Sequence, residues 1–155
     1  MKFATKTIEG PESLGFYLSR ASIVFRSLLK DTLEKSDLGS HIKPGMGSIL
    51  FALYENDGQT KTELARRLLL SKMTITRLVR DVEKHGLVKA TPDKNDGRAN
   101  RVTLTPLAKK LEKDYRNMAS DLENRLWTRF TEKEQAKFRA YLKTLLKSMD
   151  EEFAE

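Results

Sequence analysis

The sequence predicts a mainly helical protein with one small β-hairpin, and three observations carry this prediction. Apolar residues recur at spacings of three and four through most of the 155 residues, as on the buried face of a helix. Residues 87–104 instead contain two short alternating runs around a polar loop, which is typical of a hairpin. Residues 60–105 hold 11 Lys and Arg against 5 Asp and Glu, so this segment carries +6 of the chain's formal +7. A charge excess confined to one segment is typical of proteins that bind a phosphate backbone.

The first part of the chain contains two predicted helices. The first covers about residues 12–34, and its apolar stripe consists of Leu14, Tyr17, Leu18, Ala21, Val24, Phe25, Leu28 and Leu29. The second is predicted to carry Pro44 in its first turn, because proline is tolerated at the unpaired start of a helix. Apolar residues within 49–54 give this helix a buried face, and the polar residues 56–58 end it.

Two short helices follow in the basic segment. Thr60 and Glu63 have the spacing of a capping box, which predicts a third helix from Thr60 to Leu69. Ser71 is a good N-cap for a fourth helix that closes at Gly86, a residue type favoured just after a helix end. The short turn between them gives a helix-turn-helix arrangement, in which the second helix enters a DNA groove.

The last part of the chain predicts the hairpin and two long helices. Residues 87–91 and 101–104 are the two predicted antiparallel strands. Thr105, followed by a proline, starts a fifth helix whose apolar stripe consists of Leu107, Leu111, Tyr115, Met118, Leu122 and Leu126. A second capping box at residues 131–134 starts the sixth helix, whose apolar face consists of Phe138, Tyr141, Leu142, Leu145, Leu146 and Met149.

The fourth helix has an apolar face and a basic face. Its core residues at helical spacing are Ile75, Leu78, Val79 and Val82. At about 100° per residue, the opposite face carries Met73, Arg77, Arg80 and Lys84, with Thr74 and Thr76 on its flanks. Arg77 is placed to bond guanine in the major groove, whereas Arg80 and Lys84 lie further along and suit phosphates. An ordinary amphipathic helix with a solvated basic face is the simpler interpretation, and the local charge and the hairpin favour DNA.

The hairpin tip, residues 93–98, is charged and is interpreted as a wing. We expect Arg98 to enter the narrow minor groove, where an inserted guanidinium is favoured. Asp96 is expected to hold Arg98 in one rotamer through a carboxylate–guanidinium bond. Lys94 and Arg101 are expected near the phosphate backbone. A loop that is merely solvated is the alternative interpretation.

With these motifs in place, the sequence resembles the MarR-type winged helix-turn-helix regulators. The matching residues are Thr62-Glu63-Leu64-Ala65, Ser71 to Val79, Glu83 to Val88, Asp96-Gly97-Arg98 and Val102 to Thr105. A D-x-R motif followed by a strand that ends in Leu-Thr is the family's wing pattern. The sequence departs from the family in two places, since residues 87–91 lack the common arginine and Pro-Leu-Ala follows Thr105 where x-x-Gly is common.

The resemblance implies an architecture and partners. A DNA-binding lobe of about residues 43–105 would lie between dimerisation helices at about 12–34 and 106–152, all within one MarR-like domain of residues 1–155. A homodimer would present two recognition helices about 34 Å apart to a palindromic operator. Family members often bind small aromatic or anionic molecules between the lobe and the dimerisation helices, and such binding lowers DNA affinity. The candidates for that site are Tyr17, Phe25, His41, Phe51 and Tyr54, for which plain core packing is the alternative.

The predicted function is sequence-specific binding of double-stranded DNA by a transcriptional regulator, a repressor released by a small ligand. The residues expected to contact DNA are Lys61, Ser71, Lys72, Met73, Thr74, Thr76, Arg77, Arg80, Lys84, Lys94, Asp96, Arg98 and Arg101. A non-sequence-specific architectural DNA-binding protein and a winged helix used for protein contact remain as alternatives. The sequence shows no enzyme motif and no metal-ligand spacing, so we expect neither catalysis nor a cofactor. It contains no cysteine and no apolar run near the roughly 18 residues of a membrane span, which fits a cytoplasmic protein.

Overall fold

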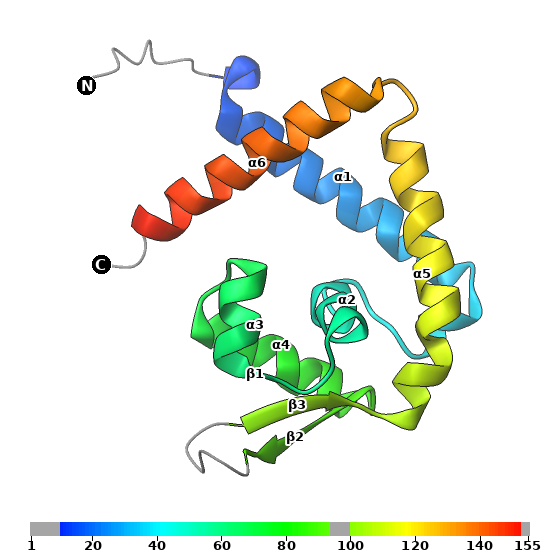
Figure 1. Cartoon of the computed structure of the whole chain (residues 1–155). Coiled ribbons are helices and arrows are strands. Elements are labelled where there is room, and N and C mark those ends of the chain that lie inside the picture. The colour runs from blue at the N-terminus through cyan, green and yellow to red at the C-terminus, as the bar shows by residue number, and fades with distance from the viewer. Residues whose placement is uncertain (1–9, 94–99, 153–155) are drawn as a thin grey trace.

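The computed structural model describes residues 10–93 and 100–152, and it is mainly helical with a small antiparallel sheet (Figure 1). The long helices are α1 (Leu14–Glu34), α5 (Pro106–Leu126) and α6 (Glu132–Glu152), and the short ones are α2 (Gly47–Glu55), α3 (Lys61–Leu68) and α4 (Lys72–Lys84). The strands are β1 (Gln59–Thr60), β2 (Val88–Pro92) and β3 (Asn100–Leu104), and two 3-10 turns cover Gly10–Glu12 and Asp37–Ser40. The predicted fold class is confirmed.

The predicted helix caps form as expected around the helix-turn-helix. The Glu63 N–H donates to Thr60 Oγ1 at 3.2 Å and the Thr60 N–H donates to Glu63 Oε2 at 2.6 Å, so the capping box is complete. The bond from the Thr60 N–H lowers the pKa of the Glu63 carboxyl. Ser71 Oγ accepts from the Thr74 N–H at 3.1 Å and caps α4. Between the two helices, Leu69 adopts a left-handed conformation with φ of 52°, which turns the chain sharply into α4.

The predicted start of the second helix is wrong. Pro44 lies in a turn ahead of α2, which begins at Gly47 with Met46 as its N-cap. Gly45 explains the difference, because its φ of +99° interrupts any helix that would start at Pro44. A Cβ on Gly47 would stand 2.3 Å from the Tyr115 hydroxyl, so the start of α2 packs directly against α5.

The sheet contains a strand that the sequence did not reveal. The two residues of β1 pair antiparallel with β3, with Gln59 opposite Val102, and the strand order is β1-β3-β2. A two-residue strand is too short to show an alternating pattern, so nothing in the local sequence predicts it. Its effect is to brace the predicted hairpin, in which Val88 lies opposite Leu104 and Ala90 opposite Val102.

One apolar core joins the helix-turn-helix lobe to α5. Its fully buried side chains include Leu33, Ile42, Ile49, Leu50, Leu53, Leu64, Ile75, Val79, Val82, Leu87 and Val102. The Tyr54 hydroxyl donates to the Ala108 carbonyl at 2.9 Å, and the Arg116 guanidinium donates to the Tyr54 carbonyl at 3.0 Å. These two bonds fix α2 against α5 and thereby set the position of the lobe relative to the long helices.

The apolar stripes of α1 and α6 remain largely uncovered. Leu33 is the one buried residue of α1, and no side chain is buried in the described part of α6. Figure 1 shows these two helices above the lobe, with α6 joined to it through α5 and α1 through the segment that holds the 3-10 turn Asp37–Ser40. Their exposed large apolar side chains are Leu14, Phe16, Tyr17, Ile23, Val24, Phe25, Phe138, Tyr141, Leu146 and Met149. So much exposed apolar surface is typical of an interaction site.

The buried phenol of Tyr54 makes the protein sensitive to alkali. Burial, assisted by the negative charge of Glu112, raises its pKa from 10.0 to about 12. Between these values the unfolded chain binds fewer protons than the folded one, so the free energy of unfolding falls as pH rises. We expect Tyr54→Phe to show a smaller fall from below pH 10 to pH 12 than the wild type in urea unfolding. The exposed Tyr141→Phe is the matched control, and equal falls in both variants and the wild type would contradict this role of Tyr54.

Candidate nucleic-acid interface

Helix α4 is anchored by its apolar face. Ile75, Val79 and Val82 are buried as predicted, whereas Leu78 is half-buried at the edge of that face. The helix packs against α3, α2 and β2. The side chain of Glu83 also accepts a bond of 2.8 Å from the Ala90 N–H, which ties α4 to the hairpin. The helix is therefore a rigid platform for whatever its outer face binds.

The outer face of α4 is basic and open to solvent, as predicted. Lys72, Arg77, Arg80 and Lys84 are exposed, and Met73 is 82% exposed. Among the residues that the structure describes, none of these four basic side chains forms an ion pair. No described carboxylate neutralises their charge, so it is available to an external anion such as a phosphate backbone.

The hydroxyl groups at the start of α4 are engaged within the helix. Ser71 Oγ lies 2.9 Å from Thr74 Oγ1, and Thr76 Oγ1 donates to the Lys72 carbonyl at 2.9 Å. Thr74 and Thr76 are half-buried on the two flanks of the basic face, as the helical spacing predicts. The side chains that project from this end of the helix are therefore those of Lys72, Met73 and Arg77.

The base of the hairpin is built by two carboxylates that the sequence analysis did not single out. Arg101 Nε forms an ion pair with Asp93, whose side chain is 4% exposed, and Arg101 Nη1 donates to the Gly58 carbonyl at 2.8 Å. Asp57 accepts from the Leu104 N–H at 2.8 Å and lies 3.2 Å from Lys109 Nζ. Arg101 is thus held at the root of the hairpin.

The remaining predicted DNA contacts fall into two groups. Lys61 is the first residue of α3 and is half-buried beside the capping box. Lys94, Asp96 and Arg98 of the predicted wing tip lie outside the described residues, so the contacts expected of them remain predictions.

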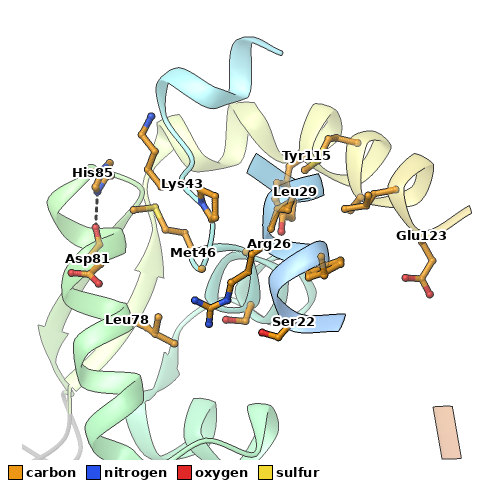
Figure 2. A pocket seen from close by; sticks show the side chains of 18 of the residues that line it. Ser22, Arg26, Leu29, Lys43, Met46, Leu78, Asp81, His85, Tyr115 and Glu123 are labelled. Atoms are coloured by element: carbon orange, nitrogen blue, oxygen red, sulfur yellow. Dashed lines mark hydrogen bonds between the residues drawn. The ribbon is translucent and has the colours of Figure 1, made fainter. Parts of the chain in front are cut away.

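A cavity of about 670 Å³ separates α4 from α1 and α5 (Figure 2). Arg26 reaches into it from α1, and Leu78 and Asp81 line it from α4. Lys43, in the loop before α2, also lines it, but its ammonium donates to the Gly39 carbonyl at 2.6 Å. The apolar wall includes Phe25, Leu29, Pro44, Met46, Met118, Leu122 and Leu126. Its volume lies in the range of small-molecule sites, which are about 300–1,000 Å³.

The charges around this cavity favour an anion. Arg26, Lys43 and Arg77 oppose the carboxylates of Asp81 and Glu123. The backbone carbonyl of Asp81 lies 2.8 Å from His85 Nδ1, and the Asp81 carboxylate takes no part in that bond. In Figure 2, Glu123 lies far from Arg26, so the neighbourhood of Arg26 is the cationic part of the cavity.

The five predicted ligand residues are not brought together. Phe25 lines the cavity, whereas His41 lies in a separate shallow recess with Glu34 and Asp37. Tyr17 is exposed on α1, and Tyr54 is buried with its hydroxyl bonded to Ala108. The ring of Phe51 lies under the Arg116 guanidinium, with 5.8 Å between the guanidinium carbon and the ring centre. Arg26, Lys43 and Met46 were missed, because nothing in the local sequence shows that residues 22–29, 43–48, 77–85 and 115–126 share a cavity.

A helix-turn-helix followed by a two-stranded hairpin, with a short third strand bracing it, defines a winged helix-turn-helix protein. Residues 42–100 match the sequence profile of the MarR family. This part of the chain is therefore a MarR-family domain, and the resemblance drawn from the sequence is confirmed.

Individual relatives agree with this assignment. The chain is 26% identical to the transcriptional regulator AdcR of Streptococcus pneumoniae over 100 residues, which are 63% of this chain and 68% of AdcR. The fold is similar to MepR of S. aureus, solved in complex with DNA, with a TM-score of 0.72, 24% identity, and 91% of this chain and 99% of MepR covered. It is also similar to BpsR of Bordetella bronchiseptica, with a TM-score of 0.75, 17% identity, and 90% and 96% covered. The BpsR structure concerns regulation of its DNA binding by 6-hydroxynicotinic acid.

No helix in residues 10–93 and 100–152 is both long and apolar enough to span a membrane. Within the same residues, no group of three or more His, Asp or Glu side chains is arranged to hold a metal ion.

Proposed function

We propose that this MarR-family regulator binds double-stranded DNA in a sequence-specific manner, with α4 in the major groove. The observation that carries the proposal is the outer face of α4, where four exposed basic side chains form no ion pair with any described residue. Phosphate contacts would come from Arg80 and Lys84, and base contacts from the first two turns. MepR, which shares the fold, has been solved on DNA, and this supports the same use of the fold here. We place the protein in the cytoplasm, without catalysis or a cofactor.

The functional unit in this proposal is a homodimer on a palindromic operator. The uncovered apolar faces of α1 and α6 support it, because a two-fold partner could bury both faces. A dimer would place its two α4 helices about one DNA turn apart, roughly 34 Å, which fits two inverted half-sites. A monomer would leave these faces in water and would read one half-site.

The wing completes the interface in this proposal. Arg98 enters the minor groove and Asp96 orients it, while Lys94 contacts the backbone. Arg101 takes a different part, because its bonds to Asp93 and the Gly58 carbonyl hold the hairpin root against β1. The orientation of the wing therefore depends on Arg101. A direct contact of Arg101 with phosphate is a secondary role.

We further propose that a small anionic, aromatic ligand in the cavity releases the protein from its operator, which makes it a repressor. The cationic part near Arg26 suits a carboxylate, and the apolar wall suits a ring. Side chains of α4 line the same cavity, so a ligand that displaces them changes the orientation of the recognition helix. The regulation of BpsR by an aromatic carboxylic acid supports this class of ligand.

We expect Arg26→Ala to impair the ligand response and to leave DNA binding intact. Loss of a charge-assisted hydrogen bond costs about 1.5–3 kcal/mol, so the ligand concentration for half-release should rise at least about 10-fold. Fluorescence anisotropy of operator DNA, titrated with 6-hydroxynicotinate and simpler benzoates, measures this change. Arg20→Ala removes an exposed arginine of α1 that does not line the cavity and serves as the control. The ligand proposal fails if no aromatic carboxylate releases the DNA, or if both variants respond as the wild type does.

Selection from a randomised duplex library at physiological salt tests the DNA-binding proposal. We expect recovery of one palindrome with half-site centres about 10 base pairs apart. Binding without sequence enrichment would instead support an architectural DNA-binding protein. No binding would support a winged helix used for protein contact.

A further inference from the structure

We propose that Met73 reads the C5-methyl group of a thymine in each operator half-site. This inference rests on the DNA-binding function proposed above and adds the base that one side chain recognises. The other side chains that project from the start of α4, Lys72 and Arg77, are cations that bond acceptor atoms. Met73 is the apolar member of this group.

The exposure of Met73 is unusual for its position. At 82% it is the most exposed of the large apolar side chains in the described part of the chain. Tyr141, the next at 71%, and most of the others lie on α1, on α6 or at the α5–α6 turn. Met73 is the one exposed large apolar side chain of α4, and it lies on the basic face of that helix.

The hydroxyl groups of Thr74 and Thr76, next to Met73, are not free to contact a base. Thr74 Oγ1 lies 2.9 Å from Ser71 Oγ, and Thr76 Oγ1 donates to the Lys72 carbonyl. Both groups already have partners within the helix, and both threonines are half-buried. The methionine side chain is flexible and unbranched, so it can extend beyond them toward a base.

The chemistry of the side chain selects its target. A thioether donates no hydrogen bond and accepts only weakly, so it cannot discriminate the polar edges of the bases. In the major groove the apolar feature is the thymine methyl group, which is read by apolar contact. A methionine at the outer face of a recognition helix therefore favours thymine over cytosine at one position.

The position of that thymine follows from the helix. Met73 and Arg77 lie four residues apart on the same face, which is about 6 Å along the helix axis. Since successive bases of one strand rise by about 3.4 Å, the thymine lies within about two base pairs of the guanine contacted by Arg77. The recovered half-site should contain both bases at this separation.

The test replaces thymine by deoxyuridine in the selected operator, one symmetric pair at a time, so that only methyl groups are removed. Loss of one buried methyl-sized contact weakens binding about fourfold, so one pair should weaken the wild-type dimer about 15-fold. Met73→Ala should bind the thymine operator more weakly by a similar or larger factor. The same deoxyuridine pair should then cause no further loss in this variant, whereas Met73→Leu should retain most of the wild-type response.

Several results would overturn the inference. These are a half-site without thymine, full affinity in Met73→Ala, or a deoxyuridine effect of equal size in the wild type and Met73→Ala. The last result would mean that the methyl group acts through DNA shape or another residue. Because Met73 is exposed, Met73→Ala should keep the wild-type thermal midpoint, and this control separates lost recognition from lost folding. A wild type that binds all duplexes alike would instead refute the proposed function itself.

Discussion

Arg77→Ala is expected to weaken binding to the selected operator at least about 30-fold, because each bidentate contact to guanine contributes about 1–3 kcal/mol and the dimer makes two. The loss should be much smaller on random duplexes, so the ratio of specific to random affinity falls. Arg77 is exposed and forms no ion pair with another described residue, so its removal leaves the fold of the lobe intact. Titration of both duplexes by fluorescence anisotropy gives the two constants.

Two other arginines provide the comparison for Arg77. Arg80→Ala should weaken all duplexes alike and reduce the salt slope by about 0.9 for each lost phosphate contact. Arg129→Ala removes the same charge at the α5–α6 turn, which Figure 1 shows at the end of α5 away from the lobe, and should change neither constant. If Arg77→Ala leaves the specific-to-random ratio unchanged, then Arg77 does not read a base.

Tyr141→Glu is expected to convert the protein from a dimer to a monomer at micromolar concentration. Tyr141 is 71% exposed on α6 within its own chain, so the protomer does not need it to fold. In the proposed dimer its ring is buried, and a buried carboxylate without a partner costs about 3–5 kcal/mol at each copy. The dissociation constant of the dimer should therefore rise at least about 100-fold, as measured by sedimentation velocity.

A control variant on the same helix separates the effect of burying a carboxylate at the interface from the effect of added negative charge. Lys143→Glu places a carboxylate two residues further along α6, on an exposed residue about 200° around the helix from Tyr141. This variant should remain dimeric and should bind the operator, whereas Tyr141→Glu should lose both properties together. A dimeric Tyr141→Glu would show that this side of α6 is not the dimer interface.

Local interactions made much of the fold predictable. The capping boxes at Thr60 and Thr131, the N-cap Ser71 and the left-handed Gly86 act within a few residues, so their signals are contiguous in the sequence. The basic face of α4 was predictable for the same reason, since helical periodicity fixes which side chains share a face. The error at Pro44 arose where a neighbouring glycine overrode a helix-start signal.

Interactions between distant segments were not predictable in this way. The partners Asp93 and Arg101, and the bond from Leu104 to Asp57, depend on the strand register, which no local pattern specifies. The cavity beside Arg26 is lined by separate segments of the chain. The predicted ligand residues were chosen because they are aromatic, and of these five only Phe25 lines the cavity. Periodicity also predicted the apolar stripe of α1. It does not show whether residues of the same chain or of a partner cover that stripe.

The ratio of affinities for the selected palindrome and for a scrambled duplex of equal length, at physiological salt, tests the central claim most directly. A sequence-specific regulator with α4 in the major groove should bind the palindrome about 10³-fold or more tightly, with two chains per duplex. A ratio near one would contradict base reading by Arg77 and Met73 and would leave the basic face of α4 as a non-specific contact with phosphates.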